Sequence, residues 1–244
     1  MISALSNILR QSKSIVFFGG AGVSTESGIP DFRSADGIYQ KEHQIPPETI
    51  LSRTFFDANP DLFFDFYRQH LVFPDAKPNR AHRALAKLER EGKLRVVITQ
   101  NVDNLHQAAG SQNVLELHGS VHRNTCMRCK KPYPLAHILT AAGIPHCSCG
   151  GIVKPNVVLY EEPLDEACME AAIRAIQNAD TLIIGGTSLA VYPAAGLIHW
   201  FRGDNLIILN KSRTPRDDEA TLRITLPIGQ SLGDAVEQLY GQPI

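Results

Sequence analysis

The chain has 244 residues, of which 43% are hydrophobic, so it can bury the core of one large domain or of one domain with a small insert. Its 24 basic and 25 acidic residues nearly balance, which argues against a surface that attracts nucleic acid or an anionic membrane. No run of about 18 apolar residues predicts a membrane span. Residues 1–13 carry no secretory pattern, so we expect a cytoplasmic protein.

Strands and helices alternate along the chain, which predicts an α/β fold with a Rossmann-like parallel sheet covered by helices on both faces. In chain order we expect a strand at 14–18, helices at 60–70 and 79–90, strands at 94–99 and 113–117, a helix at 165–178, strands at 181–184, 205–209 and 223–226, and a helix at 231–240. Segments 24–54 and 120–152 interrupt this alternation. The first is rich in Gly, Pro and Asp, and a loop of its length in a compact domain is usually functional or disordered. The second holds the four clustered cysteines.

A glycine-rich turn follows the first predicted strand, in the segment Phe17–Ser24. Glycines there allow a tight turn and close approach to a pyrophosphate, and a helix N-terminus offers N–H groups to the anion. Thr25 replaces the third glycine of G-x-G-x-x-G, and no acidic residue ends a clear second strand about 20 positions later, which disfavours a hydride-transfer enzyme. An ordinary tight turn is the alternative interpretation.

Four of the five cysteines form two close pairs, Cys126-x-x-Cys129 and Cys147-x-Cys149. This spacing predicts a tetrahedral zinc site, and four protein ligands leave no open coordination position, so we expect a structural metal. The alternatives are four free buried thiols, or His122 and His146 as substitute ligands. The fifth cysteine, Cys168, is expected to be a small apolar core residue on a helix.

Polar side chains follow the strand predicted at 94–99. Gln100, Asn101 and Asp103 stand where open α/β sheets bind ligands, and they need hydrogen-bond partners if they are buried. A ribose or a carboxamide would supply such partners. Alternatively, Asp103 caps a short helix at 104–109.

His118 ends the next predicted strand, and its imidazole can act as a general base near neutral pH. A hydrogen-bonded structural histidine is the alternative. Residues 185–188 and Asn210 provide two further polar strand ends. Several such ends converging on one edge of the sheet predict an extended dinucleotide site.

The chain resembles the sirtuin family of NAD-dependent protein deacylases over nearly its whole length. The family's motifs occur in the same order, namely GAGVS at 20–24, GIPDFR at 28–33, TQNVD at 99–103, LHG at 117–119, the four cysteines, KPNVV at 154–158, GTS at 186–188 and LN at 209–210. The resemblance implies a single catalytic domain over 1–244. Its large Rossmann-like part would comprise 1–34, 72–119 and 154–244, and its small part, with the zinc ribbon, would comprise the insertions 35–71 and 120–153.

The resemblance also implies a reaction, with NAD as co-substrate, structural Zn²⁺, and acetylated protein lysines as substrates. Nicotinamide leaves, the acyl oxygen bonds to the sugar carbon, and His118 draws a proton from a ribose hydroxyl that then attacks the acyl group. The products are lysine, nicotinamide and O-acetyl-ADP-ribose.

The same resemblance assigns roles to individual residues. His118, Asn101 and Asp103 would be catalytic, and Phe32 would shield the reactive sugar carbon from water. The NAD-binding residues would be Ala21, Gly22, Thr25, Phe32, Arg33, Gln100, Val102, Asp103, His118, Gly186, Thr187, Ser188, Asn210 and Ile228. A substrate peptide would pair as a strand with Val157, Val158, Leu159 and Tyr160.

Two departures from the family pattern bear on specificity. Tyr160-Glu161-Glu162 stands where the family often has Phe-Gly-Glu, and we expect an altered acyl-lysine site or peptide preference. Members that remove acidic acyl groups carry Tyr-x-x-Arg, whereas Tyr39 is followed at that spacing by Glu42, which would repel an anion. We therefore expect acetyl or another uncharged acyl group.

Two other functions remain open at this point. An ADP-ribosyltransferase would cleave NAD in the same way but use a different acceptor. A non-enzymatic zinc-ribbon binding module would keep NAD only as a sensor.

Overall fold

The computed structural model describes residues 1–32, 34, 37–40 and 44–244. Its main sheet has six described strands in the order β3-β2-β1-β7-β8-β9, all paired in parallel. Their bounds are β1 Ile15–Gly19, β2 Leu94–Thr99, β3 Val114–Glu116, β7 Thr181–Gly185, β8 Asn205–Leu209 and β9 Leu222–Ile224. The strand order reverses between β1 and β7, and ligands of open α/β sheets bind at such switch points.

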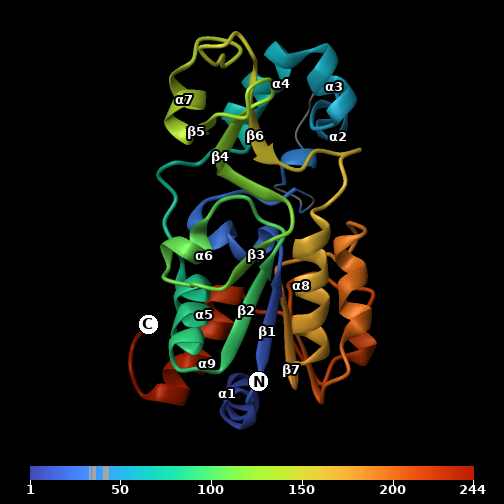
Figure 1. Ribbon diagram of the computed structural model, residues 1–244. Coiled ribbons are helices and arrows are strands. Elements are labelled where there is room, and N and C mark those ends of the chain that lie inside the picture. Colours follow the sequence, from blue (N-terminus) through green and yellow to red (C-terminus); the bar gives the residue numbers. More distant parts are fainter. Residues whose placement is uncertain (33, 35–36, 41–43) are drawn as a thin grey trace.

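Helices cover both faces of the main sheet (Figure 1). On one face lie α1 (Ile2–Gln11), α5 (Arg80–Arg90) and α9 (Ile228–Tyr240); on the other lie α8 (Glu166–Gln177) and the 3-10 helix η4 (Ala194–Trp200). Phe17 packs into the first core and Phe18 into the second. Burial on both faces explains the continuous apolar run of β1 and confirms the predicted fold class.

A smaller part lies beyond the carboxyl ends of the main strands, at the top of Figure 1. It contains an antiparallel sheet ordered β5-β4-β6 and four helices. The bounds are β4 Gly119–Cys126, β5 Pro132–Pro134, β6 Val153–Val157, α2 Pro47–Ile50, α3 Arg53–Ala58, α4 Pro60–His70 and α7 Leu135–Thr140. Its core contains edge-to-face aromatic rings, among them Phe56, Phe63 and Phe64. The predicted boundaries between the two parts stay a prediction.

Most element predictions agree with the structure, and the differences have local causes. Helix α1 was not expected, because its polar and apolar residues look mixed until Leu5 and Leu9 are seen on one buried face. Segment 120–152, in which no strand or helix was predicted, contains most of β4 together with β5 and α7, which are three and six residues long. Helix α9 begins at Ile228 rather than at residue 231, and β9 spans Leu222–Ile224 rather than 223–226.

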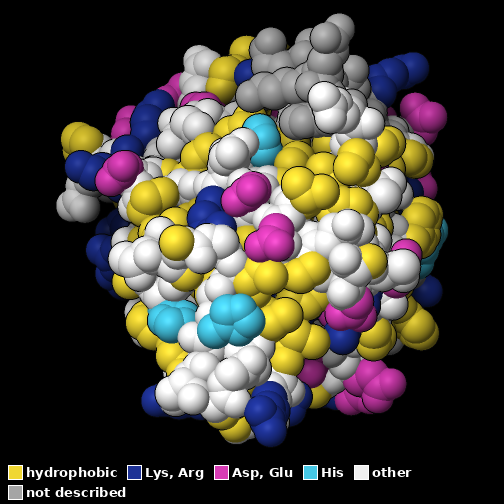
Figure 2. All heavy atoms as spheres, turned by 90° about the horizontal axis from the view of Figure 1, so that it is seen from above, with side chains coloured by type: hydrophobic (Ala, Val, Ile, Leu, Met, Phe, Trp, Pro, Cys, Tyr) yellow, Lys and Arg dark blue, Asp and Glu magenta, His cyan; other side chains and the backbone are white. Residues whose placement is uncertain are grey.

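No described helix has both the length and the apolar character needed to cross a membrane. Figure 2 shows hydrophobic, acidic and basic side chains interspersed over the face of the small part.

Candidate active site and metal cluster

Two glycine turns interlock at the carboxyl ends of β1 and β7. The Gly20 N–H donates to Gly185 O (3.1 Å), and the Gly22 N–H donates to Gly186 O (2.8 Å). A Cβ on Gly22 would lie 2.8 Å from Gly186 Cα, and a Cβ on Gly186, whose φ is +58°, would lie 2.3 Å from Val23 N. Glycine is therefore required because two backbones touch here, whatever a ligand adds.

Ser24 links two of the predicted catalytic side chains. Asn101 Nδ2 donates to Ser24 Oγ (3.1 Å), which in turn donates to Asp103 Oδ2 (2.6 Å). Ser24 is fully buried, and Asn101 is 9% exposed. The chain Asn101–Ser24–Asp103 fixes an amide and a carboxylate at the edge where β2 ends.

Asp103 Oδ1 accepts from the N–H of Leu105 (2.9 Å), the first residue of α6 (Leu105–Ala108), while the N-cap position itself is held by Asn104 and not by Asp103 as the alternative had it. Burial raises the pKa of the Asp103 carboxyl, while the bonds from Ser24 and Leu105 oppose that rise. The bond from Leu105 therefore does not exclude a role for Asp103 in the proposed site.

The imidazole of His118 is anchored by its Nδ1, which lies 2.9 Å from Gln100 O. A carbonyl only accepts, so Nδ1 carries the proton and Nε2 of the neutral ring is left as an acceptor. Burial lowers the pKa of His118 below 6.5, and the bond to Gln100 opposes this shift in part. The ring is therefore neutral at pH 7 and suited to accept a proton at Nε2.

The end of β2 is tied to the end of β7 by Gln100, whose Nε2 donates to Thr187 Oγ1 (3.1 Å). This bond joins the predicted nicotinamide side of the site to the predicted adenosine side. Thr25 Oγ1 donates to Gly22 O (3.0 Å), which shapes the glycine turn itself.

The remaining predicted NAD residues differ in how they lie. Ser188 is exposed, and Asn210 Nδ2 donates to Ser212 O (3.0 Å) beyond the end of β8. Ile228 is only 5% exposed and packs into the core beneath Gly185. Arg33 lies outside the described residues.

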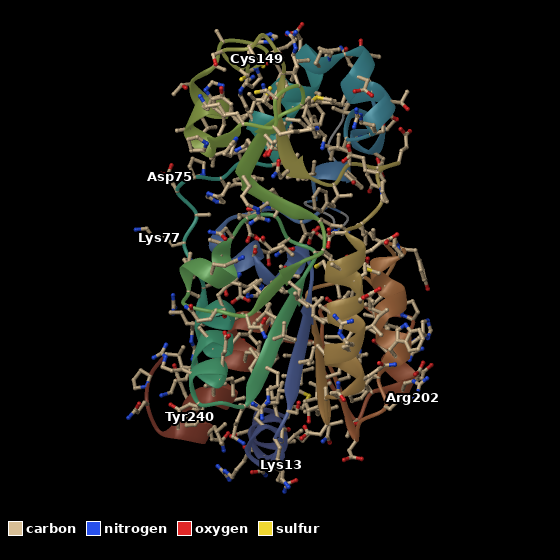
Figure 3. All side chains as sticks on the ribbon, viewed as in Figure 1. Lys13, Asp75, Lys77, Cys149, Arg202 and Tyr240 are labelled. Atoms are coloured by element: carbon tan, nitrogen blue, oxygen red, sulfur yellow. The ribbon has the colours of Figure 1, made fainter. Side chains whose placement is uncertain are left out.

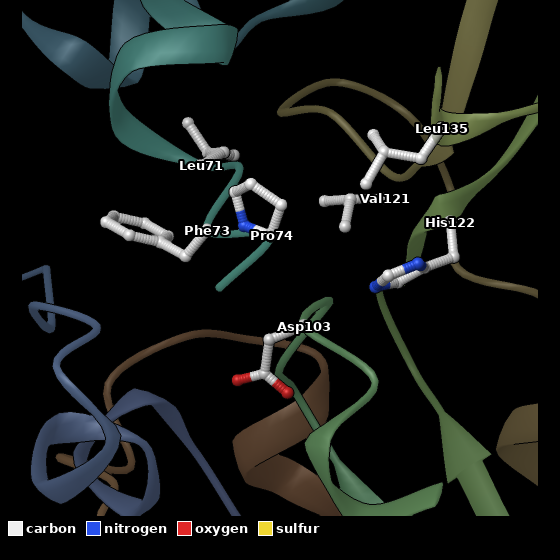
Figure 4. Close-up of a pocket in the computed structure, with 7 residues that line it drawn as sticks. All are labelled: Leu71, Phe73, Pro74, Asp103, Val121, His122 and Leu135. Atoms are coloured by element: carbon white, nitrogen blue, oxygen red, sulfur yellow. The ribbon is translucent and has the colours of Figure 1, made fainter. Parts of the chain in front are cut away.

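The two parts of the chain meet at a small hollow beside Asp103 (Figure 4). The hollow is lined by Leu71, Phe73, Pro74, Asp103, Val121, His122 and Leu135. His122 lies here and not among the cysteines, so the alternative of His122 as a zinc ligand is not supported. The hollow marks where the connection from α4 passes the predicted catalytic edge.

Four thiols converge in the small part, where Cys149 is labelled in Figure 3. The sulfur atoms of Cys126, Cys129, Cys147 and Cys149 all lie within 4.8 Å of one another. Cys126 Sγ is 3.5 Å from Cys149 Sγ, and Cys129 Sγ is 3.5 Å from Cys147 Sγ. Disulfide sulfurs are about 2 Å apart, whereas tetrahedral zinc with bonds of about 2.3 Å separates them by about 3.8 Å. The cluster fits zinc. Cys168 is partly buried against the core on α8.

The predicted substrate strand leaves the small part next to His118. The N–H of Val158 donates to His118 O (3.0 Å), that of Leu159 to Glu162 Oε2 (2.9 Å), and that of Tyr160 to Leu51 O (3.0 Å). The N–H groups of Val158, Leu159 and Tyr160 are thus already bonded within the chain. A peptide that pairs along Val157–Tyr160 would have to bond other backbone groups, and this pairing stays a prediction.

Comparison with known proteins identifies the family. The Sir2 family matches residues 20–193. An NAD-dependent protein deacetylase of Clostridium acetobutylicum is 57% identical over 235 residues, which cover 95% of this chain and 96% of that protein. A Sir2 structure solved with a deacetylated p53 peptide and 3'-O-acetyl ADP-ribose superimposes with a TM-score of 0.90 at 39% identity, covering 97% of this chain and 98% of the other. A Sir2–p53 peptide–NAD⁺ structure gives 0.85 at 38% identity, covering 98% of each.

The chain belongs to the Sir2 family. This confirms the resemblance drawn from the motifs.

Sequence reasoning did not single out Ser24 as a site residue of this Sir2 chain. Its hydroxyl stands between Asn101 and Asp103, which follow it by more than 70 positions. The only signal was its place at the end of the GAGVS motif, which by itself does not say what the hydroxyl bonds.

Proposed function

We propose that this protein is an NAD-dependent protein lysine deacetylase that transfers the acetyl group of acetyl-lysine to ADP-ribose and releases nicotinamide and O-acetyl-ADP-ribose. Family membership and the activity named for relatives at up to 57% identity support the reaction class. The observation that carries the proposal is the neutral His118 imidazole, anchored at Nδ1 beside the Asn101–Ser24–Asp103 chain at one edge of the sheet.

The interlocked glycine turns and the polar ends of β2, β7 and β8 suit a dinucleotide. Gln100, Asn101, Val102 and Asp103 would face nicotinamide and its ribose. Ala21, Gly22, Thr25, Phe32 and Arg33 would form the loop over it, and Gly186, Thr187, Ser188 and Asn210 would hold the adenosine half. Because Ile228 is buried, we expect it to pack beneath the dinucleotide-binding edge of the sheet and not to contact the dinucleotide directly.

When bound, NAD supplies an electrophilic sugar carbon, because nicotinamide is a good leaving group. His118 holds its Nδ1 proton on Gln100 O and takes a proton from a ribose hydroxyl at Nε2. Asn101 and Asp103 would hold nicotinamide and its ribose, with both side chains fixed by Ser24. The four cysteines would hold zinc that stabilises the small part and takes no chemical step.

The acyl group is proposed to be uncharged. The proposal of an uncharged acyl group rests on the carboxylate of Glu42, which lies outside the described residues. Tyr39, three positions earlier, has its Oη 2.9 Å from Tyr160 Oη. The rings of Phe32 and Tyr39 contact each other with centroids 5.4 Å apart and planes tilted by 60°. A matched panel of acetylated and succinylated peptides tests the preference, and faster removal of succinyl would contradict it. A cytoplasmic location and the absence of nucleic-acid or membrane binding stay predictions.

The decisive test is mass spectrometry of the products formed from NAD and an acetyl-lysine peptide. Nicotinamide release that depends on the acyl peptide supports the deacetylase, whereas ADP-ribose transfer to protein without that peptide favours the alternative ADP-ribosyltransferase. His118→Ala should lower the rate about 10²- to 10⁴-fold, because the general base is lost. His199→Ala, at an exposed histidine of η4, is the control and should leave the rate unchanged. Deacetylation by His118→Ala at the parent rate would refute the assigned base.

A further inference from the structure

The turn after β6 contains a residue in an unusual backbone conformation. The N–H of Glu162 donates to Leu159 O (3.1 Å), which closes a four-residue turn with Tyr160 and Glu161 at its centre. Glu161 has φ +74°, and a positive φ at the third position of such a turn is normally taken by glycine. A glutamate in this conformation needs a compensating interaction, since a Cβ disfavours it.

The side chain of Glu161 supplies that interaction. Its Oε2 accepts from the backbone N–H of Thr54 (2.9 Å) and from Thr54 Oγ1 (2.6 Å). Thr54 lies in the first turn of α3, where backbone N–H groups lack helical acceptors. These two bonds lower the pKa of the Glu161 carboxyl, so it is ionised at neutral pH and accepts them strongly.

The backbone of Tyr160, which directly precedes Glu161, is attached to the same segment. The Arg53 N–H donates to Tyr160 O (3.0 Å), and the Tyr160 N–H donates to Leu51 O (3.0 Å). An ion pair adds to this, since Arg53 Nη1 lies 3.2 Å from Glu162 Oε1. Glu162 Oε2 also contacts Lys154 Nζ at 3.1 Å, which ties the turn back to β6.

The clamped turn carries Tyr160, which the family resemblance assigns to substrate binding. Tyr160 is 38% exposed, and its hydroxyl meets that of Tyr39 at 2.9 Å. Displacement of the 159–162 turn would therefore move Tyr160 and break its contact with Tyr39.

We propose that Glu161 is a positioning residue of the acyl-lysine site: its carboxylate, bound to Thr54, holds the 159–162 turn on the segment Leu51–Thr54 and thereby fixes Tyr160 where the acylated lysine enters. The inference rests on the proposed deacetylase function. Glu161 acts through Tyr160, so it governs the acyl peptide and leaves NAD binding alone. The chain keeps the backbone shape that glycine would give at this position and adds an anchor that glycine lacks.

Three variants separate the anchor from the backbone shape. Glu161→Gln retains an oxygen that accepts from Thr54, Glu161→Gly keeps the conformation but loses the anchor, and Glu161→Ala loses both. We expect KM for an acetyl-lysine peptide to rise about fivefold in Glu161→Gly, because the net contribution of one hydrogen bond changes an equilibrium constant by about that factor. The rise should be larger in Glu161→Ala, which also loses the favoured backbone conformation. Glu161→Gln should restore the parent value, and KM for NAD and kcat should stay within about twofold of the parent in all three, since the NAD contacts do not change. Glu48→Ala, at an exposed glutamate of α2 with no side-chain bond to a described residue, is the matched control.

Amide hydrogen exchange gives a readout that needs no activity. Faster exchange at Thr54 and Tyr160 in Glu161→Gly, restored in Glu161→Gln, supports the clamp. The clamp is overturned by unchanged exchange, by parental peptide KM in Glu161→Gly, or by an equal rise in KM for NAD. A parent protein that shows no acyl-peptide-dependent nicotinamide release refutes the proposed function instead, and exchange then still decides whether Glu161 anchors the turn.

Discussion

The large and small parts of this Sir2 chain are stabilised in different ways. In the large part, strands such as β1 and β7 are buried on both faces, and two separate cores lie above and below them. The small part has a three-stranded antiparallel sheet, a core rich in aromatic rings and four clustered thiols. The first is stabilised by apolar burial on both faces of its sheet, whereas the second has a smaller core, and we expect metal binding at the cysteines to add to its stability. The proposed catalytic edge lies at the carboxyl ends of the main strands, on the side of the large part that faces the small part.

Removal of zinc should have the largest effect and should be confined to the small part. Structural zinc contributes about 10 kcal/mol or more to small metal-dependent folds. We expect a chelator or Cys126→Ser to release metal, to accelerate hydrogen exchange across β4–β6, and to abolish deacetylation while α5 and α9 stay protected. Cys168→Ala, on α8, is the control. An equal loss of hydrogen-exchange protection in both parts would contradict the expectation that zinc stabilises only the small part.

Gly186→Ala should destabilise the large part through its backbone contact. The new Cβ would lie 2.3 Å from Val23 N at φ +58°, which combines a clash with left-handed strain. We expect a loss of about 3 kcal/mol in the free energy of unfolding by urea. Gly28→Ala shares a positive φ, +83°, but meets nothing within 4 Å, so it should lose only about 1 kcal/mol. Similar losses of unfolding free energy in both variants would mean that the contact between the two glycine turns contributes little to stability.

Acid should weaken the large part through two buried histidines, His82 on α5 and His106 on α6, whose rings lie 4.7 Å apart. Burial lowers the pKa of His82 from 6.5 to about 4 and places that of His106 well below 6.5. Both imidazoles are neutral in the folded protein and take up protons on unfolding below pH 6.5. Their contribution to the free energy of unfolding is therefore fully present above pH 6.5 and is lost as the pH falls toward 4.

The shift at His82 corresponds to about 3 kcal/mol. Denaturant titrations between pH 7 and pH 4 would measure this, and His106→Phe should flatten the dependence, since neither ring nitrogen of His106 has a hydrogen-bond partner among the described residues. A pH dependence equal to that of the parent in this variant would contradict the assignment.

Ser24→Ala should have the smallest of these effects on folding but a measurable one on activity. It leaves Asn101 Nδ2 and Asp103 Oδ2 without their shared partner. We expect kcat/KM to fall about tenfold, the ratio expected for one buried polar group left unpaired. The pKa of Asp103 should rise further, because the bond from Ser24 opposes the effect of burial. The acid limb of the pH–rate profile would then move upward, and an unchanged profile would show that Ser24 does not couple to Asp103.

Local patterns in the sequence determined much of the fold. The apolar run of β2, the aromatic helix α4 and strand β8 have the predicted bounds, because each element carries its own hydrophobic period or run. The close spacing within each cysteine pair likewise predicted the cluster, since ligands that near in sequence need little of the fold to meet. The motifs also gave the family, because their order along the chain is itself information.

The tertiary structure alone decided which distant groups meet. Gly22 touches Gly186, Ser24 bridges Asn101 and Asp103, and Glu161 reaches Thr54, each across a long stretch of chain. Residue type and period describe what a segment can bury, but they do not say which other segment it will face. That choice follows from the strand order and from the position of the small part beyond the carboxyl edge of the sheet.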